Sequence, residues 1–440
     1  MSGLVAAELG RWLAGMSSAG LETSLVDQAS NHLLDTLGAI TAGQDQPVAR
    51  VARAVHDRPG TVPLPGTGET REQRDAAFVN AVAAHSLEID DTEGCDHSGA
   101  VVVPVLWSLS HGPDPAPSSR VLPALVAGYE VGRRVQLALG GYDEANGRGW
   151  HSTATCGVFA AAAAAAVMLG LDAGKATSAL GIAASSAAGT WAFAADGAMT
   201  KQLHPGNAAR GGLEAALLAA RGASGPGHVF EDVWGGFVGT HGGDPRGADR
   251  LVAELGSVWH FRHSAIKPYA VCRSAHSAID ALTGILRDER LDAAEVSEVR
   301  LHVSDFLRPM ICPPDVRDAA QARMSLPIAT ALVLAGSSLT PHDFDAFDGD
   351  EVRWWLRRIV VVADAGDGGE PLVEVRARGE THRRRVAAAR GGQDDPLSAT
   401  EVHRKFASLA VPVVGAGDAA ALTRWVDAAA SAVRCTRSPS

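Results

Sequence analysis

The sequence feature that most constrains this chain is an apolar stretch at residues 157–171 that contains seven consecutive alanines. Alanine has the highest helix propensity of the amino acids, so the stretch predicts a helix. It is shorter than the roughly 20 apolar residues that a bilayer requires, so we expect this helix in a protein core. Because alanine side chains are small, neighbouring helices can approach it closely.

Helical periodicity dominates the first half of the chain. Between residues 21 and 223, apolar residues recur at three- and four-residue spacings, and Pro- and Gly-rich turns interrupt them. This pattern predicts an all-helical body. Its clearest helices are expected at residues 76–87, 121–139, 152–169, 173–188 and 208–221.

The character of the sequence changes after about residue 264, where β-branched residues with partial alternation predict strands. Helical signals return near the C-terminus, at residues 399–406 and 419–433. We therefore expect a mainly α protein with a large all-helical domain and a smaller α+β lid domain. The helical domain takes residues 1–264 and is completed by residues 405–440, and the lid takes residues 265–404. The strands of the lid are expected at residues 296–303, 359–363, 372–377 and 381–386.

Charge and cysteine content exclude several classes of protein. The formal net charge of −11 argues against a nucleic-acid partner, which would require a basic face. The five cysteines are far apart and form no CxxC pair, which argues against a disulfide framework and fits a reducing cytoplasm. The first 16 residues predict a surface helix and not a signal peptide, so we expect no membrane partner. Neither a dinucleotide fingerprint after a strand nor a Walker-type GK[ST] is found, so no nucleotide cofactor is expected.

Residues 85–97 concentrate ionisable side chains at the expected end of a helix, with five carboxylates and two imidazoles in thirteen positions. A solvated loop is one interpretation, because runs of charge are usually exposed. A metal site is another, with His85 and Asp90, or Asp91 and His97, as ligands. The lack of HExxH and of calcium-loop spacing argues against the metal.

His151 lies where a Gly-rich loop meets the alanine-rich helix. Ser152 or Thr153 is a candidate N-cap of that helix, which would place His151 beside a helix N-terminus. Such a position lowers the pKa of an imidazole and attracts anions, including carboxylates. A purely structural hydrogen-bonding role for His151 is the alternative.

Two further clusters supply cations in this acidic chain. Lys201 and His204 precede the helix expected from residue 208, and a fourth cluster opens the second domain. A cleft between the domains would bring these two clusters together with residues 85–97 and the segment around His151. Such a cleft would suit a small anion with several carboxylates. A pyridoxal phosphate enzyme also needs a lysine, but the sequence shows no phosphate cradle. The fourth cluster contains Lys267, Cys272, Arg273 and His276.

These clusters, in this order and at this spacing, resemble the MmgE/PrpD family, which includes 2-methylcitrate dehydratase, cis-aconitate decarboxylase and iminodisuccinate epimerase. The resemblance covers nearly the whole chain. It implies a large helical domain joined by both chain ends, a smaller α+β lid, an active site between them, and a homodimer. The motifs that carry it are residues 85–92, 149–151, 201–209 and 267–269, then Cys272, Arg273 and His276, and finally residues 395–397 and 405–406.

In the decarboxylase branch of the family, the resemblance places the site positions on seven residues of this chain. Two of them depart from the branch, because Glu88 replaces an Asp and Cys272 replaces a His. His276 could take over part of the imidazole function. The seven positions are Glu88, Thr92, His97, His151, Lys201, Lys267 and Cys272.

We expect from the residues and the resemblance a cofactor-independent lyase without a metal, most similar to a 2-methylcitrate dehydratase, that removes a proton next to a carboxylate of a small polycarboxylic acid. Lys201, Lys267 and Arg273 would neutralise the substrate carboxylates. His151 is the expected base, and His97 the expected acid that protonates the departing hydroxyl.

Glu88, Asp90 or Asp91 could replace His97 as the acid, although Asp91 could equally be structural. Thr92, Cys272 and His276 are expected to contact the substrate together with Arg273. The alternative functions are an epimerase or isomerase, a decarboxylase of a related acid, and a non-catalytic protein that binds a carboxylate metabolite.

Overall fold

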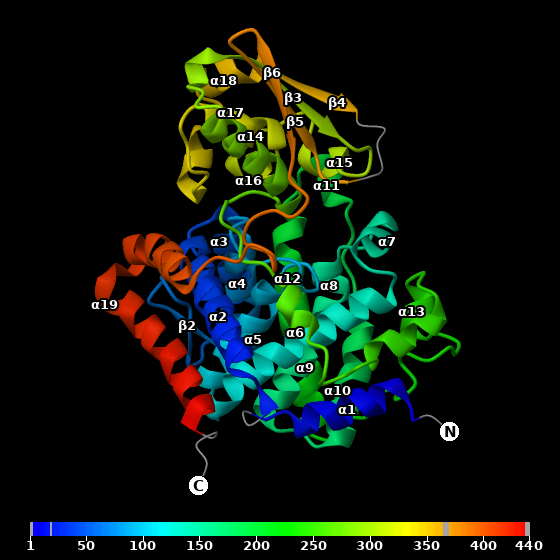
Figure 1. Cartoon of the computed structure of the whole chain (residues 1–440). Helices are drawn as coiled ribbons and strands as arrows, with labels where there is room; N and C mark the ends of the chain where they lie inside the picture. Colours follow the sequence, from blue (N-terminus) through cyan, green and yellow to red (C-terminus); the bar gives the residue numbers. More distant parts are fainter. Residues whose placement is uncertain (1–2, 18–19, 364–368, 436–440) are drawn as a thin grey trace.

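The computed structural model describes residues 3–17, 20–363 and 369–435. A large helical body carries a smaller lid, and both ends of the chain lie on the body at the side away from the lid (Figure 1). The fold class expected from the sequence, mainly α with a smaller α+β part, is confirmed.

The alanine-rich helix α9 (Gly157–Leu169) lies at the centre of the body. Its seven alanines are buried, and helices pack on it from several sides. A Cβ atom added to Gly212 of a neighbouring helix would lie 2.4 Å from the Cβ of Ala161, so the close approach requires small residues on both helices. The helices that pack against α9 are α5 (Ser98–His111), α6 (Val121–Ala138), α10 (Ala173–Ala183) and α12 (Thr200–Ala220).

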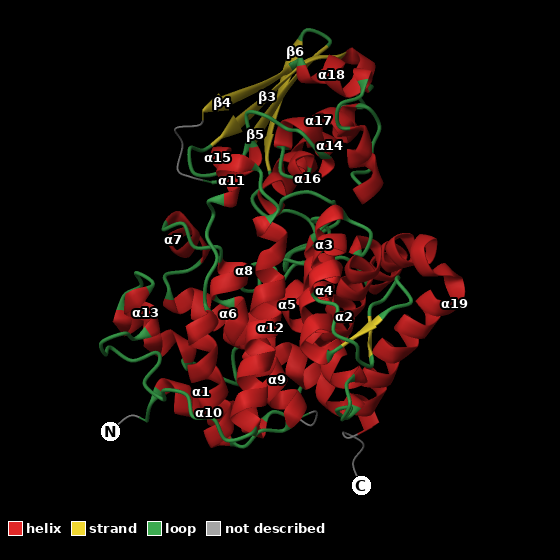
Figure 2. Cartoon of the chain, turned by 180° about the vertical axis from the view of Figure 1, so that it is seen from behind, coloured by secondary structure: helices red, strands yellow, loops and turns green. Residues whose placement is uncertain are grey.

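Shorter or more peripheral elements complete the body, which is seen from behind in Figure 2. The helix expected at residues 152–169 is divided at Cys156, where one separate turn precedes α9. The remaining elements are α1 (Val5–Gly15), α2 (Thr23–Gly43), α3 (Pro47–Val55), β1 (Val62–Pro63), β2 (Thr70–Arg71), α4 (Gln73–His85), α7 (Tyr142–Gly147), α8 (Ser152–Thr155), α11 (Phe193–Asp196) and α13 (Phe237–Thr240).

Helix α12 begins earlier than the sequence predicts, at Thr200 in place of residue 208. Pro205 and Gly206 are residues that commonly interrupt helices, but both lie inside this one. A Cβ atom on Gly206 would lie 2.8 Å from Val82 and 3.1 Å from Phe78, so the glycine allows α12 to approach α4. Packing therefore keeps this segment helical, and Lys201 lies in the first turn of a long helix.

The lid is built on a four-stranded sheet with the order β4-β3-β5-β6. The first pair is parallel and the other two pairs are antiparallel. All four predicted strands are confirmed, the last with a shift of one residue, and helices α14 and α17 pack on the sheet. The elements are α14 (His276–Asp288), β3 (Val296–Val303), α15 (Arg308–Ile311), α16 (Ala319–Ala322), α17 (Leu326–Leu334), α18 (Asp350–Leu356), β4 (Ile359–Ala363), β5 (Leu372–Ala377) and β6 (Glu380–Arg385).

The last helix, α19 (Ala399–Cys435), lies along α2 of the body and bends at Gly415, whose φ is 75°. Lys405 of α19 lies 2.6 Å from an Asp35 carboxylate oxygen and donates to the carbonyl of Ile89 over 2.7 Å. The chain end is thereby tied to the loop that follows α4. By length and composition both α19 and residues 152–169 could span a membrane, but 94% of the latter stretch is buried inside the body.

Candidate active site

The loop after α4 has an unusual backbone. Glu88, Glu93 and Asp96 have positive φ angles of 53°, 63° and 82°, a region that non-glycine residues seldom adopt. Such conformations persist only where the surrounding structure enforces them, and they concentrate at functional sites. His85, Glu88, Asp90, Asp91, Asp96 and His97 are all buried. The interpretation of this segment as a solvated loop is therefore wrong.

Two lysines from different parts of the chain contact the Glu88 carboxylate. The Lys201 ammonium, from α12, contacts Oε1. The Lys267 ammonium, from the segment that enters the lid, lies 3.0 Å from Oε2 and 3.1 Å from the Glu88 carbonyl oxygen. All three residues are at most 5% exposed, so the charges are held away from water and depend on one another.

Opposing influences act on the pKa of Lys201. Burial, followed by the like charge of Lys267, lowers this pKa to about 7. Contact with the Glu88 carboxylate favours the charged ammonium. The charge of Lys201 at neutral pH therefore depends on Glu88.

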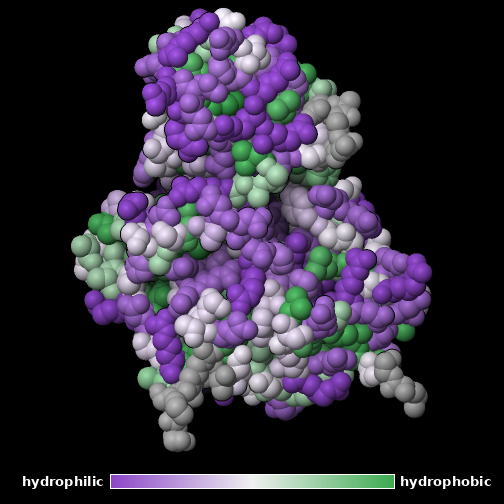
Figure 3. All heavy atoms as spheres, in the orientation of Figure 1, coloured by the Kyte–Doolittle hydropathy of each residue, from purple (hydrophilic) through white to green (hydrophobic). Residues whose placement is uncertain are grey.

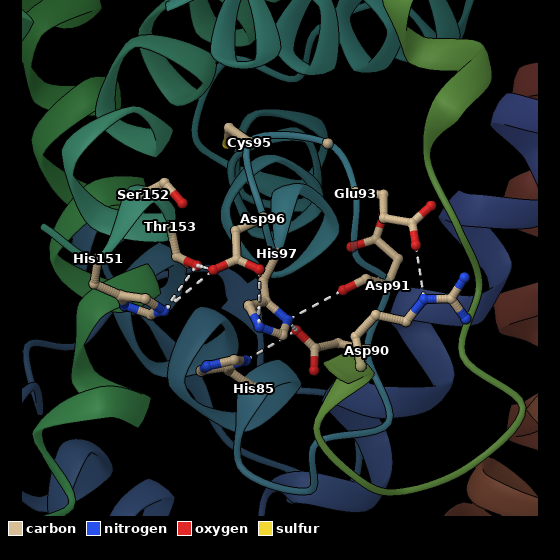
Figure 4. Close-up of polar contacts among 12 residues, drawn as sticks. His85, Asp90, Asp91, Glu93, Cys95, Asp96, His97, His151, Ser152 and Thr153 are labelled. Atoms are coloured by element: carbon tan, nitrogen blue, oxygen red, sulfur yellow. Dashed lines mark hydrogen bonds and ion pairs between the residues drawn. The ribbon is translucent and has the colours of Figure 1, made fainter. Parts of the chain in front are cut away.

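His97 lies between two carboxylates (Figure 4). Its Nδ1 atom is 2.9 Å from Asp90 Oδ2, and its Nε2 atom is 3.5 Å from Asp96 Oδ1. Burial by itself lowers the pKa of His97, but the two carboxylates outweigh burial and raise this pKa above its usual value. The two carboxylates therefore favour the charged form of His97, which can donate a proton.

His85 has the opposite protonation state. Its Nδ1 atom lies 2.9 Å from Asp90 Oδ2, and its Nε2 atom lies 3.2 Å from the Lys201 ammonium. Burial, then Lys201, holds the pKa of His85 well below its usual value. The neutral ring donates from Nδ1 to Asp90 and accepts from Lys201 at Nε2.

Three imidazoles of the site could be considered as metal ligands, because nitrogen atoms of His85, His97 and His151 lie within 4.8 Å of one another. Each ligand must offer a lone pair to the metal. The two carboxylates beside His97 favour its protonated form, which has none, and His85 shares its lone pair with Lys201. The arrangement suits a network of proton donors and acceptors better than a metal.

His151 lies to the left of Asp96 and His97 in Figure 4, on the far side of Asp96 from His97. It occupies the N-cap position of α8 itself, so the expectation that Ser152 or Thr153 caps this helix is wrong. Its Nε2 atom is 3.4 Å from Asp96 Oδ2 and 3.2 Å from the Thr153 hydroxyl. Burial lowers the pKa of His151, which keeps the ring neutral.

Asp91 points away from the lysines and packs into the body. Its carboxylate accepts a hydrogen bond from the Gly99 N–H over 2.8 Å and another from the Tyr129 hydroxyl. His32 Nδ1 lies 2.9 Å from the same carboxylate. Through these contacts Asp91 holds the start of α5, which begins directly after His97.

The residues that the sequence predicts to contact the substrate lie around the entrance of the lid. Arg273 forms an ion pair of 2.7 Å with Glu93 and also donates to two backbone carbonyls. Thr92 forms a backbone bridge with Ala265. His276 is fully buried and bonds to the Val271 carbonyl.

A cavity of about 720 Å³ lies between the body and the lid, where Figure 3 shows a recess with hydrophilic residues along one side. Its volume is that of a small-molecule site. The body contributes Thr92, Asp96, His97 and Lys201, and the entrance of the lid contributes Cys272 and Arg273. Glu88, His151, Lys267 and His276 are not among the described residues that line it. Sequence reasoning missed other lining residues that belong to no motif, among them Arg133, Tyr142, Trp191 and Glu370.

Residues 7–247 match the MmgE/PrpD N-terminal domain, and residues 269–429 match the MmgE/PrpD C-terminal domain. The cis-aconitate decarboxylase-like protein oryM of Aspergillus oryzae is 28% identical over 445 residues, which cover 94% of this chain and 92% of that protein. The cis-aconitate decarboxylase of Aspergillus terreus is 30% identical over 67% of this chain, and the human one is 30% identical over 68%. These two alignments cover 63% and 61% of those decarboxylases, less than two thirds of their length.

Proposed function

This chain belongs to the MmgE/PrpD family, and from that premise we propose that it is a lyase acting on a small polycarboxylic acid. The proposal rests on one observation, that Lys201 and His97, whose charged form two carboxylates favour, both line the cavity between body and lid. A cation that holds a carboxylate next to a proton donor is the minimum that such a lyase requires.

Within this class, the loss of carbon dioxide is the first candidate reaction. The relatives described above are decarboxylases or similar to them by name, and one alignment covers nearly the whole chain. When a carbon–carbon bond to a carboxylate breaks, its electron pair stays on the substrate and a proton must be added to carbon. His97 would supply that proton, while Lys201, Arg133 and Arg273 on the cavity wall would hold the carboxylates that remain.

Elimination of water is the second candidate, because Glu88 and Cys272 replace the Asp and His expected of the decarboxylase branch. This reaction needs a base that reaches the substrate. His151 does not line the cavity, so it would act only through Asp96 or His97. In this second reaction His97 would protonate the departing hydroxyl.

The two reactions are distinguished by their products. The purified protein is incubated in heavy water with cis-aconitate and, separately, with 2-methylcitrate. Release of carbon dioxide with one deuteron on carbon supports the decarboxylase, and a new alkene absorbance without gas supports the dehydratase. A His97→Gln variant controls for background activity. If an acid raises the melting temperature of the protein but no product forms, the chain is a carboxylate-binding protein and the enzyme proposal fails.

A further inference from the structure

Behind the cavity wall, ionisable side chains form an unbroken row. His204 Nδ1 lies 2.8 Å from His151 Nδ1, and His151 Nε2 lies 3.4 Å from Asp96 Oδ2. The other oxygen of Asp96 faces His97 Nε2 at 3.5 Å. The Thr153 hydroxyl lies 3.2 Å from both His151 Nε2 and Asp96 Oδ2, so it bridges the 3.4 Å gap between His151 and Asp96 (Figure 4).

The two ends of this row have different surroundings. His97 lines the cavity, whereas His204 is not among the described residues that line it. His151, in the middle, is fully buried, but His204 keeps 5% of its surface exposed. The rings of Trp191 and Phe193 pack on His151 with centroid separations of 5.2 and 5.5 Å, which closes the middle of the row to water.

We infer that His204, His151 and Asp96 form a proton relay that reprotonates His97 after each turnover. The inference rests on the proposed function, since a lyase that adds a proton to carbon and releases carbon dioxide leaves His97 neutral. A polycarboxylate in the cavity, or the product that follows it, separates His97 from bulk water. A second route for the proton is then needed.

The proton can be followed atom by atom. A proton enters at His204 Nε2 while the proton on Nδ1 passes to His151 Nδ1. His151 releases its Nε2 proton, directly or through the Thr153 hydroxyl, to Asp96 Oδ2. The carboxyl group of Asp96 turns and delivers the proton to His97 Nε2. Rotation of the two imidazole rings resets the row, and no oxidant or other reactant is required.

The charges around the row give the transfer its direction. Burial, then His151 and Lys201, lowers the pKa of His204 to about 3, so this ring passes a proton on without keeping it. Burial raises the pKa of Asp96, but His97 and His151 outweigh burial and lower it to about 2. The raised pKa of His97 makes it the strongest proton acceptor of the row.

His204→Asn separates a relay from a structural hydrogen bond. The amide nitrogen of Asn is as many bonds from the backbone as His Nδ1, so the variant keeps a donor toward His151 but cannot transmit a proton. A matched control is His111→Asn, because His111 also bonds through Nδ1 to a single neighbour, the Trp107 carbonyl, at the far end of α5.

Rapid-mixing measurements on the whole protein provide the test, with whichever acid the wild type turns over. In His204→Asn the first turnover per site should keep the wild-type rate, because His97 starts protonated. The steady-state kcat should then fall at least about tenfold and KM should fall with it, so that kcat/KM stays unchanged, and added imidazole should restore kcat. A wild-type steady state in His204→Asn overturns the relay, as does a first turnover that is slowed as much as the later ones. His204→Gln gives the same readouts if the Asn variant does not fold. A wild type without turnover refutes the proposed function instead.

Discussion

Replacement of Glu88 by Gln should make the activity depend on pH through Lys201. Gln has nearly the same size as Glu but removes the carboxylate that contacts the ammonium groups of Lys201 and Lys267. Burial and Lys267 lower the pKa of Lys201 to about 7, and in the variant no carboxylate of residue 88 favours the charged form. We therefore expect Lys201 to titrate near neutral pH in Glu88→Gln.

The size of the effect follows from this pKa. A lysine charged only below about pH 7 is about 90% ammonium at pH 6 and about 10% at pH 8, and each further pH unit removes another factor of about ten. Since the ammonium is the form that holds a carboxylate, kcat/KM of the variant should fall as pH rises. Between pH 6 and pH 9 the ratio of wild type to variant should increase about 100-fold.

The assay is kcat/KM from pH 6 to pH 9 for wild type, Glu88→Gln and Glu88→Asp. The Asp variant is the matched control, because it keeps the negative charge with one methylene less. The pH dependence of kcat/KM in the Asp variant should match that of the wild type, even if its absolute kcat/KM is lower. Parallel profiles for Glu88→Gln and wild type would refute the dependence of the Lys201 charge on Glu88, and so would an Asp variant that declines like Gln.

Three other predictions concern the acid, the structural carboxylate and metals. His97→Gln should lower kcat/KM at least about 100-fold in protein that is still folded at the assay temperature, since it removes the cavity-lining proton donor. Asp91→Asn should lower the free energy of unfolding in urea by about 1–3 kcal/mol, because its carboxylate accepts buried hydrogen bonds from Gly99 and Tyr129. Prolonged dialysis against a chelator should leave kcat unchanged. An activity that disappears on dialysis and returns with zinc would show that the imidazoles of His85, His97 and His151 bind a metal and are not only proton donors and acceptors.

The mainly α fold with a smaller α+β part could be predicted because it rests on local signals. Alternation marked the strands of the lid, and alanine content marked the central helix of the body. The start of α12 could not be predicted, because Pro205 and Gly206 interrupt helices in general, but here both lie inside α12 and Gly206 packs against α4. Only the packing of distant residues overrides such a signal.

The roles of neighbouring residues in the site were also beyond local reasoning. Asp90 and Asp91 are adjacent in sequence, yet Asp90 lies between His85 and His97 while Asp91 contacts the body at Tyr129. Adjacent residues in an irregular loop can point to opposite sides, and sequence alone does not assign the sides. His151 was the expected base, but Asp96 and His97 lie between it and the cavity.

A balance of charge explains how so many ionisable groups remain buried together. The cations of the cluster are Lys201, Lys267 and His97, and the carboxylates are Glu88, Asp90 and Asp96. Loss of one partner from a buried pair costs about 3–5 kcal/mol when the other charge persists. Lys201 can avoid this cost, because a pKa near neutrality lets it release its proton when Glu88 is neutralised. A substrate carboxylate would restore the missing charge and hence the proton. Substrate binding by Glu88→Gln at pH 8 should therefore take up protons, whereas binding by the wild type, whose lysines are already paired, should take up fewer.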